Sequence, residues 1–315
     1  MANLFVAIAL LGAALLPTGC ASPTTQAASA RLRVVVSGPP SSQPYRFGVA
    51  LAEAVGKHTG LTLTVGGMAS SVPTMRMLQK GEADIGLAFG DAAYLAFMGA
   101  IEPDGERLNG VRAIAVLQPR PLHLLVPPGS DIRHVADLRQ RRVAINAQDL
   151  SAPLVLEALH APIAQIRLEP FPAQGSAAAF RAGIVDAIVT STSDPSPAIT
   201  EATDAGVRIL PLDGPAVPAL RQRYPFLRPV AIRGGTYRGH PSVVRTIGVD
   251  HLLICRASLD PVVVYEITRS LVESLPSLVS VDPSFGRFEI ERAASAPIPL
   301  HEGAARYYRA RELAQ

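Results

Sequence analysis

Cysteine and lysine are nearly absent from this chain, and their scarcity limits the chemistry that it can perform. The 315 residues hold two cysteines, and the only lysines are Lys57 and Lys80, both expected at helix ends. The chain also lacks a phosphate-binding loop ending in Gly-Lys-Ser/Thr, a His-Glu-x-x-His pair, a Cys-x-x-Cys pair and a Gly-x-Ser-x-Gly elbow. We therefore expect no enzyme activity, no cofactor and no metal site.

A long apolar run occurs once, at the N-terminus. Leu4 to Leu16 is shorter than the roughly 20 residues of a spanning helix and has the length of a signal-peptide core. Thr18-Gly19-Cys20 follows it and resembles the end of a lipobox, although Pro17 stands where leucine is usual. We predict a signal peptide over 1–19 and lipidation of Cys20, with ordinary secretion and an uncleaved anchor as the alternatives.

The predicted lipid anchor implies that the protein is attached to a membrane. Residues 20–31 are small and polar, so we expect them to form a tether next to the lipid. The protein would then lie in the periplasm or on the outer face of the cytoplasmic membrane, attached by its lipid. Cys255 lies in the apolar run that starts at Leu252 and is expected in the core, so no disulfide within the chain is expected.

The length of the chain indicates how many lobes it forms, and its charge indicates which partners to expect. The chain beyond the leader exceeds the usual size of one hydrophobic core, which favours two lobes. The net charge is +3 and the isoelectric point 9.1, and the charge comes from scattered arginines rather than from lysine blocks. No basic stripe with interleaved aromatics is present, so nucleic acid is not an expected partner.

Short apolar runs alternate with helical patterns, which is typical of βαβ units with mainly parallel sheets. Strands are predicted over 33–36, 61–65, 85–89, 111–117, 122–126 and 246–256, and helices over 47–58, 91–97, 261–275 and 302–313. The two prolines of Gln118-Pro119-Arg120-Pro121 are expected to break a continuous ladder and to mark a crossover or hinge.

One pattern occurs twice and indicates a weak internal duplication. In both Lys80 to Leu87 and Arg181 to Val189, a helix ends at glycine and an aspartate precedes a buried strand. The two aspartates are Asp84 and Asp186, and we expect each to tether its turn.

The segment from Ile298 to Arg309, IPLHEGAARYYR, resembles the closing signature of the TAXI family. This family comprises the extracytoplasmic solute receptors of tripartite ATP-independent periplasmic (TRAP) transporters. The resemblance extends through Ser71-Val72, Gly81 to Leu87, Asp91 with Tyr94, Arg112 to Ala115, Pro121 to Leu124, Val135 to Leu138, Pro195 to Ala198, Leu210 to Gly214, Tyr224 to Phe226 and Gly235 to Gly239.

The resemblance implies a type II periplasmic-binding-protein fold: an α/β protein with two lobes, a two-segment hinge and a ligand in the cleft. We expect lobe 1 to comprise 32–120 and 246–315, and lobe 2 to comprise 121–245. The ligand would be a small, anionic organic acid or amino acid, and the partner would be the membrane subunits of a TRAP permease. Helix N-termini at the carboxyl ends of strands offer N–H groups to such anions.

Four predicted cleft elements depart from the family pattern, so the ligand differs from glutamate or binding is lost. Two prolines enter the first loop, 37–46, where the family has a Gly-rich loop. Phe89-Gly90-Asp91 replaces Gln-Ser-Asp, and Pro119-Arg120-Pro121 replaces a Pro-Glu-Pro-like hinge. The loop 146–151 is about one helical turn shorter than usual.

Candidate ligand-binding residues lie where loops and helix starts follow predicted strands: Ser70, Ser71, Thr74, Asp91, Tyr94, Ser193, Asp194 and Tyr237, together with Arg46 and Arg120. The arginine fork fits a carboxylate through two parallel bonds. Helix capping, packing and turn chemistry are the alternative for the hydroxyls, aspartates and tyrosines, and a solvated loop position is the alternative for both arginines.

Two other functions remain open from the sequence. The same fold serves receptors of ABC importers and ligand sensors. An enzyme on this scaffold would need a catalytic group in the cleft, and spacing along the chain does not report whether two distant carboxylates meet there.

Overall fold

The structure is a computed structural model that describes residues 31–101, 105–145, 149–159, 167–170, 175–281 and 283–314. The predicted signal peptide, Cys20 and all of the predicted tether except its last residue lie outside the described residues. So do residues 146–148 of the shortened loop.

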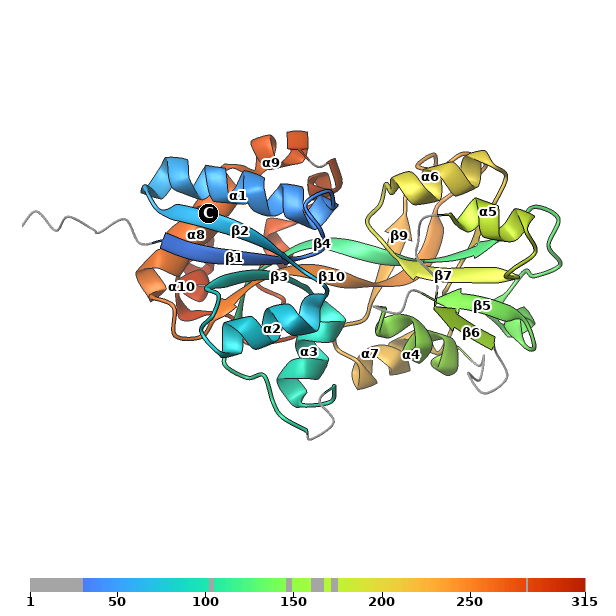
Figure 1. Cartoon of the computed structure of the whole chain (residues 1–315), viewed down its shortest axis with the longest axis horizontal. Helices are drawn as coiled ribbons and strands as arrows, with labels where there is room; N and C mark the ends of the chain where they lie inside the picture. The colour runs from blue at the N-terminus through green and yellow to red at the C-terminus, as the bar shows by residue number, and fades with distance from the viewer. Residues whose placement is uncertain are drawn as a thin grey trace, which may run out of the picture.

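Two α/β lobes are connected by two long strands that run through both of them (Figure 1). These strands are β4 (Val111–Val126) and β10 (Val244–Arg256), and they pair antiparallel from Gly248↔Pro121 to Arg256↔Val111. The chain enters lobe 2 through β4 and returns through β10, so the connection between the lobes is a two-stranded hinge.

The other elements pack on one lobe or the other. Lobe 1 holds β1 (Arg31–Ser37), α1 (Gln43–Thr59), β2 (Thr62–Met68), α2 (Ser71–Gln79), β3 (Ile85–Phe89), α3 (Gly90–Met98), α8 (Pro261–Glu273), α9 (Leu275–Val281), the 3-10 turns η3 (Pro283–Arg287) and η4 (Ile290–Arg292), and α10 (Glu302–Glu312). Lobe 2 holds η1 (Val135–Leu138), β5 (Arg142–Ile145), α4 (Ser151–Ala158), β6 (Arg167–Pro170), α5 (Ser176–Arg181), β7 (Ala187–Ser191), α6 (Pro197–Asp204), β8 (Arg208–Leu210), α7 (Val217–Arg223) and β9 (Arg228–Ile232).

The two lobes have the same strand order. Outward from the hinge, lobe 1 reads β10-β3-β1-β2 and lobe 2 reads β4-β7-β5-β6. In each lobe the three outer strands are parallel to one another and antiparallel to the hinge strand beside them. The weak duplication that the sequence indicated is therefore present in the topology.

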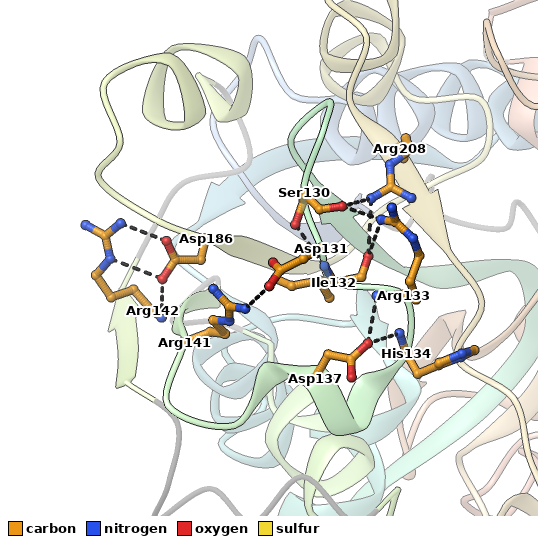
Figure 2. Close-up of polar contacts among 10 residues, drawn as sticks. All are labelled: Ser130, Asp131, Ile132, Arg133, His134, Asp137, Arg141, Arg142, Asp186 and Arg208. Carbon is orange, nitrogen blue, oxygen red and sulfur yellow. Dashed lines mark hydrogen bonds and ion pairs between the residues drawn. The ribbon is translucent and has the colours of Figure 1, made fainter.

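The duplicated aspartates tether equivalent strands, as predicted. The Asp84 carboxylate accepts a hydrogen bond of 2.8 Å from the backbone N–H of Arg33, whose carbonyl accepts from the Asp84 N–H at 2.9 Å. Asp186 makes the same two bonds with Arg142, at 2.8 and 2.9 Å. In lobe 2 the Arg142 guanidinium also forks onto the Asp186 carboxylate (Figure 2). Both aspartates are structural.

The predicted break at the hinge prolines is wrong, because β4 is continuous from Val111 to Val126. Successive N–H groups of a strand point to opposite sides. Pro119 and Pro121 are two residues apart, so they remove donors from one side only and leave the ladder on the other side intact. The expected change of lobe does occur there, since β4 pairs with β10 up to Pro121 and with β7 from Leu122.

Lobe 1 shows how local sequence places helices on the sheet. The Asp260 carboxylate caps α8 by accepting from the Val262 N–H at 2.7 Å, and Pro261 fits the first turn. Val264, Ile267 and Leu271 of this helix are buried at helical spacing against the α1 face of the sheet. The helix ends at Glu273, two residues earlier than predicted, and α9 begins at Leu275.

We predict that Gly248→Ala destabilises the hinge. The added Cβ would lie 2.6 Å from the carbonyl oxygen of Arg120 and 2.8 Å from a methyl group of Val230, so the ladder must shift. The expected loss is about 1–3 kcal/mol of unfolding free energy, measured by urea denaturation. Gly66→Ala in β2 is the control, because its Cβ would meet nothing within 4 Å. Equal effects of the two substitutions would contradict the prediction.

Candidate functional site at the hinge

The strand ends of both lobes meet at the hinge. Phe89 at the end of β3 pairs with His251, and Ser191 at the end of β7 pairs with Leu122, so both strands point their carboxyl ends at the crossing. Helices α1, α2 and α3 follow the strands of lobe 1, and α4 and α6 follow those of lobe 2. Free N–H groups and loop side chains of both lobes therefore gather in the same region.

Arg120 on β4 is the charged residue at the centre of this region. Its guanidinium carbon lies 3.7 Å from the centroid of the Phe89 ring, on the lobe 1 side. Its Nη2 atom donates to the Ser191 carbonyl of lobe 2 at 2.5 Å. The charges of Asp149 and Asp91 favour its protonated form, while burial lowers its pKa. One side chain of the hinge thus contacts both lobes.

Asp149 faces Arg120 from lobe 2 and organises the start of α4. Its Oδ1 atom accepts from the Ser151 hydroxyl at 3.0 Å and from the Ala152 N–H at 3.3 Å. Its Oδ2 atom accepts from the Ser191 N–H at 2.7 Å, which ties the loop to the end of β7. Burial raises the pKa of Asp149, and Arg120 opposes this shift. Asp149 is therefore a cap and a partner of the central arginine.

Asp91 faces the same cluster from lobe 1, in the first turn of α3. Its Oδ1 atom accepts from the N–H of the next residue, Ala92, at 2.7 Å, but the N-cap residue of α3 is Phe89, so Asp91 does not cap the helix as predicted. Burial raises the pKa of Asp91 to about 6, the Asp149 charge adds to the rise, and a hydrogen bond with Ser151 opposes it. Ser151 of lobe 2 thus hydrogen-bonds with both carboxylates, Asp91 and Asp149, and both carry charge that acts on the Arg120 guanidinium.

A second contact between the lobes uses Ser193 and Asp194. The Ser193 hydroxyl donates to the Gln43 side-chain oxygen of lobe 1 at 2.7 Å. The buried Asp194 carboxylate pairs with Arg287 of η3, whose other terminal nitrogen donates to the Ala231 carbonyl at 2.9 Å. Burial raises the pKa of Asp194, and Arg287 opposes this shift. Both predicted residues lie between the lobes, where they hold the lobes together.

The predicted hydroxyls of α2 belong to lobe 1. The Ser71 hydroxyl accepts from the Phe89 N–H at 3.1 Å, beside the ring on which Arg120 stacks. Ser70 is half-buried at the start of the helix, and its carbonyl accepts from the Thr74 hydroxyl at 3.2 Å. Thr74 is fully buried under α2, so its side chain packs inside the lobe.

Three further candidates lie away from the cluster around Arg120. The Tyr94 ring is half-buried, 5.6 Å from the ring of Phe226 in lobe 2. Tyr237 is buried within lobe 2, where its hydroxyl accepts from the Ser196 N–H at 3.0 Å. Arg46 is exposed on the first turn of α1, rather than in a loop, and donates to the Ser41 carbonyl at 2.8 Å.

The structure adds residues that the sequence did not single out. Asp149 and Ser151 precede a helical pattern, so a capping signal was present, but nothing local indicated that they face Arg120. Gln43 and Arg287 lie 150 and 93 residues from their partners and carry no such signal. His251 is buried 5.0 Å from the Phe89 ring, and burial lowers its pKa to about 3, with Arg120 adding to the effect.

No group of three or more histidine, cysteine, aspartate or glutamate side chains placed to hold a metal ion occurs among the described residues. None of the helices described in residues 31–314 is both long and apolar enough to cross a membrane.

Two lobes, a two-stranded hinge and converging strand ends define a type II periplasmic-binding-protein fold, which confirms the predicted fold class. A protein of Xanthomonas citri bound to ATP has a similar structure, at 14% identity over 90% of this chain and 95% of that one, with a TM-score of 0.54. The GluR0 ligand-binding core in complex with L-glutamate is similar at 12% identity over 83% and 99%, with a TM-score of 0.50.

The VFT2 domain of BvgS from Bordetella pertussis is also similar, at 14% identity over 82% of this chain and 93% of that one, with a TM-score of 0.50. Identities this low show the common fold alone. Residues 35–311 match the NMT1-like family, and the chain belongs to that family.

We predict that Asp91 destabilises the folded protein as pH rises. Its pKa increases from 3.8 to about 6 on folding, so the folded chain retains a proton that the unfolded chain loses between these values. Because of this titration, the free energy of unfolding should fall between about pH 4 and pH 6. Asp91→Asn removes this loss, and relative to wild type it should gain up to about 3 kcal/mol between pH 4 and pH 7.

Urea unfolding at pH 4 and pH 7 measures the difference. Asp213→Asn is the control, because that carboxylate is exposed and pairs with Arg245 on the surface. Parallel pH profiles for wild type and Asp91→Asn would show that Asp91 does not titrate in this range.

Proposed function

We propose that this protein is an extracytoplasmic receptor that captures a small organic acid or amino acid between its lobes and delivers it to a TRAP-type permease. The proposal depends chiefly on one observation: polar side chains of both lobes converge on Arg120 at a two-stranded hinge. Such a hinge permits rigid lobes to open and close, and closure removes a bound solute from water. The same fold binds L-glutamate in the GluR0 core, which supports a receptor rather than an enzyme.

The cluster around Arg120 suits a ligand that carries a carboxylate. The guanidinium fork can bind a carboxylate through two bonds once the lobes separate and the protein's own acceptors withdraw. Asp91 and Asp149 then remain to accept bonds from an ammonium group or, when protonated, to donate to a second carboxylate. An amino acid or a dicarboxylic acid offers these complements, which is why we favour these two classes.

The proposed permease class is based on the closing signature, and the structure gives that segment a structural role. His301 caps α10 by accepting from the Gly303 N–H at 3.2 Å. The Tyr308 hydroxyl donates to the Ile114 carbonyl at 3.0 Å, and the Tyr307 and Tyr308 rings lie in the lobe 1 core. The signature therefore supports the proposal through the scaffold and not through ligand contacts.

We also propose that Cys20 carries the lipid anchor and that residues 20–31 form the tether next to the membrane. A receptor held in this way stays close to its permease, which raises the local concentration of the loaded receptor at the membrane.

A panel of amino acids and organic acids tests the receptor by thermal shift. A ligand present at 100 times its dissociation constant should stabilise the wild type by about 2.7 kcal/mol. Arg120→Gln combined with Asp149→Asn leaves the local charge unchanged but removes the fork, so it should abolish the shift. Arg238→Gln, on the exposed surface, should keep it. If no compound of the panel stabilises the wild type, the receptor proposal fails.

Cys20→Ala tests the anchor. The variant should be exported and folded but should no longer incorporate labelled lipid or partition into detergent, because the acylated thiol is gone. Cys255→Ala is the matched control, since that thiol is fully buried in lobe 1. Membrane partitioning that survives Cys20→Ala would rule out lipidation at this residue.

A further inference from the structure

A second polar site lies between the lobes and shares no residue with the cluster around Arg120. It is a cavity of about 180 Å³, lined by Arg221 of α7, Arg228 of β9, Asp250 of β10 and Arg292 of η4. Gly90, at the start of α3, and Phe226 belong to its wall. The volume equals that of about six water molecules in the liquid, so it can hold a group of a few non-hydrogen atoms.

The cavity has more positive than negative charge. Three guanidinium groups line it, and the single carboxylate in its lining is that of Asp250. This carboxylate lies 2.7 Å from the Arg228 Nε atom and 3.7 Å from an Arg292 terminal nitrogen. Outside the lining, the exposed carboxylate of Glu289 lies 3.7 Å from the Arg292 Nε atom. Three cations thus face two carboxylates, one of which is outside the cavity.

The geometry leaves donors available. Among the described residues, the buried Nε atoms of Arg228 and Arg292 have no aligned hydrogen-bond acceptor, and Asp250 Oδ1 has no aligned donor. The ion pair between Arg228 and Asp250 is therefore close in distance but poorly directed. Burial lowers the pKa of Arg228 and raises that of Asp250, and the attraction between the two charges opposes both shifts. Guanidinium donors that have no aligned acceptor favour an added anion.

The residues that line the cavity come from both lobes, so an anion bound there would contact both. Arg221 and Arg228 belong to lobe 2, Arg292 belongs to lobe 1, and Asp250 is on the hinge strand. Figure 1 shows α3 and α7 on the same side of the crossing strands, and the contact between Tyr94 and Phe226 confirms that these parts approach. An anion bound by arginines of both lobes would connect them.

We propose that this cavity is a binding site for a small oxyanion, a phosphate or a carboxylate group, separate from the solute site at Arg120. The planar guanidinium groups supply paired donors that match the oxygens of either group. The bound anion stabilises the closed arrangement of the lobes, because its ligands come from both.

Titrations of the full chain test the site by thermal shift. Inorganic phosphate and acetate form two separate arms, each compared with sodium chloride at the same ionic strength. We expect a saturable rise of the unfolding midpoint with at least one of the two anions, and the arm that responds identifies the oxyanion. A rise that grows linearly without saturation, or no rise beyond that of chloride, overturns the proposal.

Charge-neutralising variants locate the effect. Arg292→Gln and Arg221→Gln should each lower the affinity for the anion at least tenfold. The control, Arg238→Gln, removes one positive charge on the exposed surface of lobe 2 and should change this affinity by less than twofold. Arg228→Gln combined with Asp250→Asn removes the ion pair without leaving an unpaired buried charge, and it should also abolish saturation. Equal affinity in Arg292→Gln and in Arg238→Gln overturns the proposal.

The variant Arg120→Gln with Asp149→Asn separates the two sites. It should still respond to phosphate or acetate, because none of its changes lines the cavity. Loss of the anion response in this variant means that the anion binds at the hinge cluster, and the separate site is then refuted.

Discussion

The close approach of the two hinge strands is the constraint on which the rest of this molecule depends. Where Gly248 passes the Arg120 carbonyl, there is no room for a side chain. This approach lets β4 and β10 form a ladder that continues from one lobe into the other, from Gly248↔Pro121 to Arg256↔Val111. It also places the Arg120 side chain where strands of both lobes end. A wider crossing would separate these strand ends and remove the shared polar site.

The charged groups at the hinge come from both lobes and from the hinge strand itself. Arg120 comes from the hinge, Asp91 from lobe 1 and Asp149 from lobe 2. Neighbouring His123 and His251 are buried, and burial lowers their pKa values to about 4 and about 3, so both are neutral at physiological pH. In the part of the chain that the structure describes, Arg120 is therefore the one positive charge that faces the two carboxylates, and separation of the lobes changes the surroundings of all three. Such coupling allows solute binding and lobe closure to influence each other.

The duplicated half-sheets explain why the strand ends of both lobes point at the hinge. Each lobe has one hinge strand and three parallel strands that run towards the crossing, and each has an aspartate that fixes the start of its third strand. The similarity ends at the loops. The lobe 1 turn after β3 supplies Phe89 and Asp91, while the lobe 2 turn after β7 supplies Ser193 and Asp194, so the two halves contribute different chemistry to one interface.

The sequence by itself determined the local elements and the class of fold. Apolar periodicity and glycine before the tethering aspartates are signals between near neighbours, and neighbours along the chain stay neighbours in the fold. These signals predicted the βαβ organisation and the aspartate tethers. Pro119 and Pro121 misled the prediction of β4, because the sequence does not show that both missing donors lie on one side of the strand.

Only the tertiary structure decided which polar residues meet. Gln43 reaches Ser193 across 150 residues, and Arg287 reaches Asp194 across 93. Arg46 and Arg120 were equivalent as loop arginines in the sequence, yet one is exposed on a helix and the other stacks on Phe89 between two carboxylates. Their difference arises from how the hinge strands cross, a long-range contact that no local pattern encodes.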